Sequence, residues 1–206
     1  MTLLQRVIDT AVNLSNEIVL VIGRDDDFPS FLEDRRPSIT TIRDTRTGMG
    51  PMMGIYTGMK RLTSEYALVL PCDAPFISIP LMRELMGFVR GYDAAIPIWS
   101  NRNVEPLHSI YRVSPSIKAI GSALDHGEKS VLEFIKRLER TNYVHIETLR
   151  EFDSELLTFF NVNYPEDLET AHEILSGNKY YCSGYMCLGC RVGKYPSFKS
   201  LCLIDI

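Results

Sequence analysis

The chain of 206 residues lacks the features that direct a protein to a membrane, to secretion or to nucleic acid. It has no apolar run near the roughly 20 residues that span a bilayer, and its first residues lack the charged-then-apolar pattern of a secretion signal. Its 22 Lys and Arg against 26 Asp and Glu give a formal net charge of -4, so no basic field attracts nucleic acid or an anionic membrane. We therefore expect a cytoplasmic protein that binds phosphate only locally, with no nucleic-acid or membrane partner.

Cysteine is scarce and unevenly placed. Cys72 stands alone, and the other four lie in the tail at Cys182, Cys187, Cys190 and Cys202. This is not the spread framework of a disulfide-stapled secreted domain, so we expect reduced thiols. The tail spacing leaves a zinc or iron–sulfur site open, but a variable extension is the simpler interpretation because the second pair lacks its own short spacing.

Helical and strand-like segments alternate over residues 1–175, and hydrophobic residues make up 45% of the chain, enough for one well-packed domain. The continuous apolar runs EIVLVIG and YALVLP are typical of strands buried on both faces. The other predicted strands lie at residues 38–42, 92–98, 105–113, 142–147 and 157–163. This alternation predicts an α/β fold with a doubly wound, mainly parallel, Rossmann-like sheet. Residues 176–206, rich in Gly, Tyr and Cys, are expected to form a poorly ordered tail.

An acid, Asp73, follows the predicted strand YALVLP almost at once. Ligands of open α/β sheets bind at the carboxyl ends of the strands, where the loops diverge. A carboxylate there can hold Mg²⁺, which bridges nucleotide phosphates. The alternative is an N-cap for the helix that starts near Pro80, but Asp73 lies several residues too early for that role. Asp73 is therefore the first candidate site residue.

Two asparagines follow the last predicted strand and precede a helix that begins near Pro165. Asn161 and Asn163 can add neutral oxygen ligands to the same metal. Asn163 also stands three residues before Glu166, which fits a capping box for that helix. Both the metal-binding and the capping interpretation remain open from the sequence.

A glycine-bearing loop, RDTRTGMGPMMG, follows another predicted strand. Asp44 stands where that strand ends, and Gly50 and Gly54 allow the backbone a close approach to a ligand. Pro51 suits the first turn of the helix that follows. The spacing is neither that of a P-loop nor G-x-G-x-x-G, so the loop alone predicts only a flexible turn.

Four motifs in order, GPMMGI, CDAPFI, EPLHSIY and NVNYPEDL, resemble the MobA family of molybdenum cofactor guanylyltransferases. The resemblance covers residues 1 to about 175 and implies a nucleotidyltransferase fold. It further implies Mg²⁺-dependent transfer of GMP from GTP to molybdopterin, with release of pyrophosphate, and transient contact with other proteins of molybdenum cofactor assembly.

The resemblance also implies roles for individual residues. Asp73 would be the principal Mg²⁺ ligand, completed by Asn163 and Asn161. Asp44 would help to hold the nucleoside, above a floor shaped by Gly50, Pro51 and Gly54. Glu105, Pro106 and His108 would lie on the pterin side, although His108 equally fits a partly buried strand residue.

The sequence departs from this family near its start. Family members begin with a strand and a glycine-rich loop, L-x-G-G-x-x-x-R-x-G, which holds the triphosphate, and this pattern does not occur in the 206 residues. The segment GRDDDFPS is a poor substitute because three consecutive acids repel a triphosphate. We therefore expect an N-terminally truncated domain with a vacant central sheet position and low activity.

Three alternatives to the guanylyltransferase interpretation remain at this stage. A related enzyme of the same fold could use CTP, because the residues that choose the base lie largely in the glycine-rich loop. It could also use another phosphorylated acceptor. The third alternative is a non-catalytic binding protein of the same fold. This alternative predicts no Mg²⁺-dependent nucleotide binding.

Overall fold

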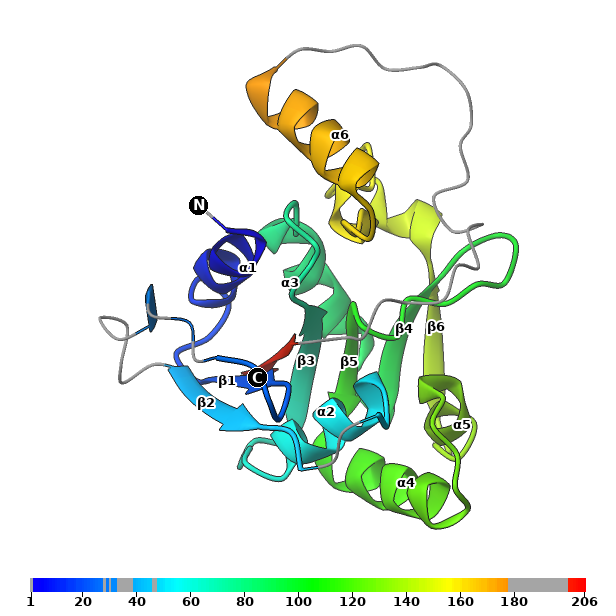
Figure 1. The fold of residues 1–206 in the computed structure, drawn as a ribbon. Helices are drawn as coiled ribbons and strands as arrows, with labels where there is room; N and C mark the ends of the chain where they lie inside the picture. Colours follow the sequence, from blue (N-terminus) through cyan, green and yellow to red (C-terminus); the bar gives the residue numbers. More distant parts are fainter. Residues whose placement is uncertain (1, 28, 30, 33–38, 46–47, 178–199) are drawn as a thin grey trace.

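In the computed structural model, a seven-stranded sheet lies between two layers of helices (Figure 1). The structure describes every residue except 1, 28, 30, 33–38, 46–47 and 178–199. The strands are β1 (Ile18–Ile22), β2 (Ile39–Arg43), β3 (Tyr66–Pro71), β4 (Ala94–Ile98), β5 (Ser109–Arg112), β6 (Thr141–His145) and β7 (Ser200–Asp205). The helices are α1 (Leu3–Ala11), α2 (Pro51–Met59), α3 (Ile79–Phe88), α4 (Val113–Asp125), α5 (Val131–Ile135) and α6 (Pro165–Ser176).

Five of the seven strands run in the same direction. Across the sheet the order is β2-β1-β7-β3-β5-β4-β6. The pairs β1 with β2 and β4 with β6 are parallel, whereas β7 is antiparallel to β1 and β3, and β5 is antiparallel to β3 and β4. Only β7 and β5 are therefore reversed, and the other five strands end at one edge, the carboxyl edge. The prediction of a mainly parallel α/β sheet is confirmed.

The C-terminal strand β7 overturns the prediction of a vacant sheet position. It lies between β1 and β3 and pairs with both, so Leu20 and Leu70 each face Cys202 across the ladder. Ser200–Asp205 are thus part of the sheet and not of a poorly ordered tail. Residues 178–199, which include Cys182, Cys187 and Cys190, lie outside the described residues. Backbone pairing on both sides of β7 supplies the hydrogen bonds that a vacancy would have left unmade.

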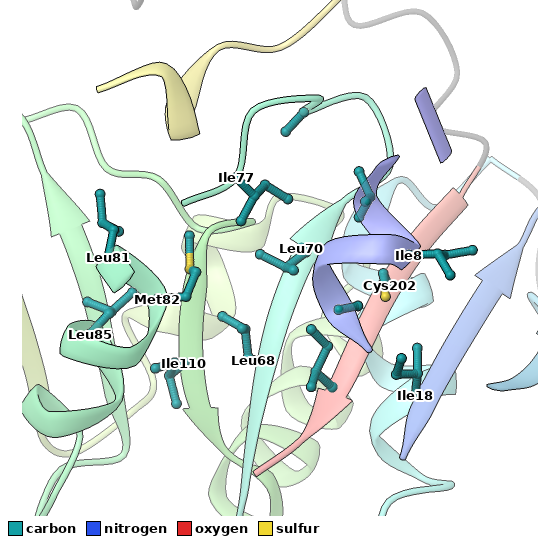
Figure 2. Packing of buried hydrophobic residues seen from close by; sticks show 14 of the residues in the cluster. Ile8, Ile18, Leu68, Leu70, Ile77, Leu81, Met82, Leu85, Ile110 and Cys202 are labelled. Atoms are coloured by element: carbon teal, nitrogen blue, oxygen red, sulfur yellow. The ribbon is translucent and has the colours of Figure 1, made fainter. Parts of the chain in front are cut away.

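Alternate residues of β7 enter the two halves of the core. Cys202 and Ile204 are fully buried in the cluster beneath α1 and α3. Figure 2 shows Cys202 on the side of the sheet that α1 covers, close to Ile8. Leu203, also fully buried, joins the opposite cluster with α2, α4 and α5. This alternation is the expected result of a period of two on a strand covered on both faces.

Gly58 of α2 lies close against β7 and β1. A Cβ atom at this position would lie 2.5 Å from a methyl carbon of Leu203 and 3.0 Å from one of Val21. The absence of a side chain therefore lets α2 pack directly on β1 and β7. A glycine at position 58 thus leaves room for the side chain of Leu203 on the central strand β7.

Two predicted strands differ from the structure. β2 is an edge strand, and of its residues only Ile39 is buried, because one side of an edge strand remains open to solvent. Residues 157–163 do not form a strand. A 3-10 turn spans Leu157–Phe159, preceded by Leu156 in a left-handed conformation with φ 54°. Burial of Phe159 and Phe160 explains the apolar run without strand pairing.

Candidate active site

Asp73 lies just past the end of β3, at the carboxyl edge of the sheet. It does not cap α3, because Ser78 does so by accepting a hydrogen bond from the N–H of Leu81. Oδ1 of Asp73 is buried and has no hydrogen-bond partner among the described residues. Burying an acceptor without a donor costs free energy, so a proton or a bound ligand would stabilise this oxygen.

Asn161 reaches the same place from the segment that precedes α6. The N–H of Val162 donates a hydrogen bond of 2.9 Å to the carbonyl oxygen of Asp73, which holds the two segments side by side. Oδ1 of Asn161 is also buried and, within the described part of the chain, has no hydrogen-bond partner. Two side-chain oxygens without donors thus lie on adjoining segments, although their residues are far apart in the sequence.

His108 lies directly before β5, which begins at the same edge because it runs against β3. It is fully buried, and neither ring nitrogen has a hydrogen-bond partner among the described residues. Its Nδ1 is 3.7 Å from Oε2 of Glu105, and its ring meets that of Phe159 edge-on at 5.3 Å between centroids. His108 is thus fully buried and lies just outside β5, whereas the alternative left open from the sequence was a partly buried strand residue. Its nitrogens, unpartnered within the described part of the chain, leave capacity for a ligand.

Glu105 is held by a second partner. Nε1 of Trp99, directly after β4, donates a hydrogen bond of 2.7 Å to Oε1 of Glu105. The ring of Trp99 also meets that of Phe159, with centroids 5.9 Å apart. Trp99 and Phe159 were missed by the sequence reasoning. The position of the only tryptophan directly after a predicted strand was the available signal for Trp99.

Burial sets the proton affinity of the carboxyl group at this edge. It raises the pKa of Asp73 above its usual value, while a backbone hydrogen bond and the nearby His108 act in the opposite direction. Burial also raises the pKa of the neighbouring Cys72 thiol well above its ordinary range, so that this side chain stays protonated. A bound cation would reverse the effect on Asp73 by favouring its charged form.

Of the residues expected around the nucleoside, Gly50 and Pro51 lie at the start of α2, whereas Asp44 contacts its second half. Asp44 follows β2, its N–H donates to the carbonyl oxygen of Ile22, and its Oδ1 accepts a hydrogen bond of 3.2 Å from Thr57 of α2. Gly50 is the N-cap of α2 with φ 68°, a conformation that favours glycine. Pro51 occupies the first turn, as predicted, and Gly54 is buried within the helix.

The predicted capping box of Asn163 and Glu166 is wrong. Tyr164 is the N-cap of α6, and the carboxylate of Asp167 accepts hydrogen bonds of 2.9 Å from the backbone N–H groups of both Asn163 and Tyr164. Asn163 therefore takes part through its backbone, and its Nδ2 lies 3.5 Å from the carbonyl oxygen of Asn161. The side-chain oxygen of Asn163 is not used as a cap.

The oxygen ligands at this edge fit a hard cation that keeps part of its hydration shell. In the part of the chain that the structure describes, no three His, Cys, Asp or Glu side chains come together as a metal site. Mg²⁺ is commonly held by one or two carboxylates, waters and substrate phosphates, and does not need such a cage. Oδ1 of Asp73 and Oδ1 of Asn161 supply one carboxylate oxygen and one amide oxygen, neither with a hydrogen-bond partner among the residues that the structure describes.

Comparison with known proteins identifies the family. The model of the MobA-like NTP transferase domain matches residues 1–141. The chain belongs to this family. A probable molybdenum cofactor guanylyltransferase from Methanosarcina mazei is 33% identical over 173 residues, which are 82% of this chain and 76% of the relative. A similarly named protein from Natronomonas pharaonis is 30% identical over 181 residues, which are 84% of this chain and 85% of the relative.

Solved structures agree with this MobA-like assignment. Molybdopterin-guanine dinucleotide biosynthesis protein A from Archaeoglobus fulgidus superposes with a TM-score of 0.67 at 28% identity, over 85% of this chain and 86% of that one. The 4-diphosphocytidyl-2C-methyl-D-erythritol synthase from Anaerococcus prevotii has a TM-score of 0.64 at 19% identity, covering 85% and 86%. The second likeness shows the fold alone. None of the helices of this MobA-like chain that are described is long and apolar enough to cross a membrane.

Proposed function

We propose that this MobA-like protein transfers GMP from GTP to molybdopterin in a Mg²⁺-dependent reaction. The observation that carries the proposal is the pair of buried oxygens of Asp73 and Asn161 at the carboxyl edge, which have no hydrogen-bond partner in the described part of the chain. The names of the relatives supply the nucleotide and the acceptor. The reaction joins a phosphate oxygen of molybdopterin to the α-phosphorus of GTP, and the bond from that phosphorus to the bridging oxygen breaks, releasing pyrophosphate.

Positioning and charge are the main tasks of the protein in such a transfer, since little covalent chemistry is required. When bound, Mg²⁺ would neutralise charge on the phosphates and the leaving group. Asp73 and Asn161 would hold it, with Asn163 close by. Asp44, Gly50 and Pro51 would line the nucleoside side, where the first turn of α2 presents backbone N–H groups.

The acceptor would lie on the side of Glu105 and His108. Trp99 fixes Glu105 through its indole N–H, and Phe159 packs against both aromatic neighbours, so these side chains are held before a ligand arrives. The two ring nitrogens of His108, which have no hydrogen-bond partner among the described residues, can each donate or accept one hydrogen bond. Groups fixed in this way orient an acceptor without further ordering cost.

Nucleotide binding with and without metal tests this proposal. We expect GTP with Mg²⁺ to raise the melting temperature of the 206-residue chain, and GTP with EDTA to raise it less. Turnover can be measured as pyrophosphate released in the presence of molybdopterin. We expect it to be slow, because the glycine-rich loop pattern does not occur in the 206 residues.

Three outcomes would contradict the proposal. Equal stabilisation by CTP and GTP would contradict the choice of base, and turnover with another phosphorylated acceptor but not with molybdopterin would contradict the acceptor. The absence of any metal-dependent nucleotide binding would favour a non-catalytic protein of this fold.

A further inference from the structure

A pocket lies at the opposite edge of the sheet from Asp73. Asp93 directly precedes β4, Arg140 directly precedes β6, and Arg112 ends the reversed strand β5, so all three lie where the parallel strands begin. They line an open pocket of about 410 Å³ together with residues of α4 and of the segment after α5. In Figure 1, α4 and α5 lie at the lower end of the sheet, and α6 at the upper end.

Four basic side chains converge on this pocket from separate elements: Arg112, Lys118, Arg137 and Arg140. Two acids, Asp93 and Glu139, also line it. Glu65 and Glu128 pair with two of the arginines, so the acids at and beside the pocket equal the basic groups in number. The pocket is therefore distinguished by the gathering of cationic side chains, three guanidinium groups and one ammonium, and not by a local excess of charge.

Two of the basic groups are already held in place. Arg112 pairs with Glu65 at 2.9 Å, and Arg137 pairs with Glu128 at 2.8 Å. The guanidinium of Arg137 also donates a hydrogen bond of 2.7 Å to the carbonyl oxygen of Glu133. Such groups lose less side-chain entropy when a ligand binds.

The other two basic groups have spare capacity. Among the described residues, neither the Lys118 ammonium nor the Arg140 guanidinium forms an ion pair or a hydrogen bond. Of the two acids in the lining, Asp93 is only 5% exposed, and its carboxylate accepts a hydrogen bond of 3.0 Å from the backbone N–H of Arg140. The other, Glu139, is exposed and directly precedes Arg140. Within the described part of the chain, the pocket thus has two cationic side chains without partners, one buried acid that is already hydrogen-bonded and one exposed acid.

The start of α4 adds a favourable dipole. Ser114 and Pro115, in its first turn, line the pocket, and the N-cap residue Arg112 makes no capping hydrogen bond with its side chain. A second pocket of about 370 Å³ adjoins the first and shares Arg112, Ser114 and Pro115 with it. Helix N-termini favour anions, so the dipole and the side chains act in the same direction.

We propose that this basic pocket is a binding site for a small molecule that carries a phosphate or pyrophosphate group, separate from the candidate active site. A concave site with fixed guanidinium groups suits an oxyanion, which Arg binds through paired hydrogen bonds. The pocket volume of about 410 Å³ is in the range of small-molecule sites, so a small ligand is the occupant that we favour. The proposal does not depend on the reaction at the carboxyl edge.

Titration with inorganic pyrophosphate in EDTA tests the site without metal-dependent binding at Asp73. We expect saturable binding by isothermal calorimetry, with amide NMR shifts centred on Arg112, Ser114 and Arg140. The double variant Lys118→Glu/Arg140→Glu should bind at least about tenfold more weakly, because it removes two charge-assisted hydrogen bonds and adds two repelling carboxylates. Inorganic phosphate and GTP in parallel titrations distinguish a simple phosphate ligand from a nucleotide.

The matched control is Arg24→Glu/Arg83→Glu, which changes the charge equally at two exposed positions that line neither pocket. It should retain the affinity of the unmodified chain. Equal losses in both variants would overturn the proposal, since general charge would then explain the binding. A failure of the unmodified chain to bind at millimolar pyrophosphate would overturn it as well, as would NMR shifts confined to the carboxyl edge.

Discussion

The backbone N–H of Val162 donates a hydrogen bond of 2.9 Å to the carbonyl oxygen of Asp73. This contact joins the end of a central strand to the segment before the last helix, and it places Asn161 beside the aspartate. Both side chains then present buried oxygens without donors. The predictions that follow test whether this arrangement binds metal and whether β7 supports it.

Replacing Asp73 by Asn should lower Mg²⁺-dependent turnover by at least about 100-fold, because the charged metal ligand is lost. The melting temperature in EDTA should stay the same or rise, since the change removes a buried carboxylate. The exposed Asp125, near the end of α4, provides the control Asp125→Asn. Activity close to that of the control would remove Asp73 from the site.

The pH dependence of stability should carry the signature of Asp73. Because its pKa in the folded state is raised, the folded chain binds more protons than the unfolded chain just above the ordinary aspartate pKa, about 3.9. The free energy of unfolding without metal should therefore fall as pH rises through that window, up to the raised pKa. Comparing melts of the chain and of Asp73→Asn isolates this contribution. A difference that does not change with pH would contradict the raised pKa.

Asn161→Ala should raise the Mg²⁺ concentration needed for half-maximal nucleotide binding, by about tenfold for the loss of one fixed ligand. Asp167→Ala should instead lower stability by about 1 kcal/mol through loss of the α6 cap, with little effect on the metal requirement. Calorimetry and chemical denaturation separate the two effects. The reverse pattern would mean that Asn161 is structural.

Gly58→Ala should destabilise the fold by about 1–3 kcal/mol, because the new methyl group overlaps Leu203 and Val21. Gly87→Ala in α3 is the matched control, since nothing lies within 4 Å of its added Cβ, and it should be neutral or stabilising. Urea unfolding measures both variants. Equal effects would show that α2 does not pack closely on β7.

Leu203→Ala should cost about 2–5 kcal/mol, as for other fully buried leucines. In the double variant with Gly58→Ala, the shortened side chain makes room for the added methyl group, so the combined loss should be less than the sum. Additive losses would mean that the two residues do not touch, and they would argue against the central place of β7.

Local sequence patterns were sufficient for much of the fold and for the position of one candidate site residue at a strand end. The apolar runs of β1 and β3 could be recognised because strands buried on both faces are apolar throughout. The helix start at Pro51 followed from local backbone preferences. Asp73 could be selected because the end of a parallel strand is a local feature of the chain.

Contacts between distant segments decided the rest. β7 is a short run at the end of the chain, and its place between β1 and β3 depends on hydrogen bonds to both partners and on Gly58, none of which leaves a periodic pattern. Asn161 was placed on a strand that does not exist, because burial of Phe159 and Phe160 imitates a strand pattern. The sequence by itself determined where the buried strands β1 and β3 lie and that Asp73 follows β3. Only tertiary packing decided which strand ends meet, since the pairing of remote segments is set by the shared core and not by neighbours along the chain.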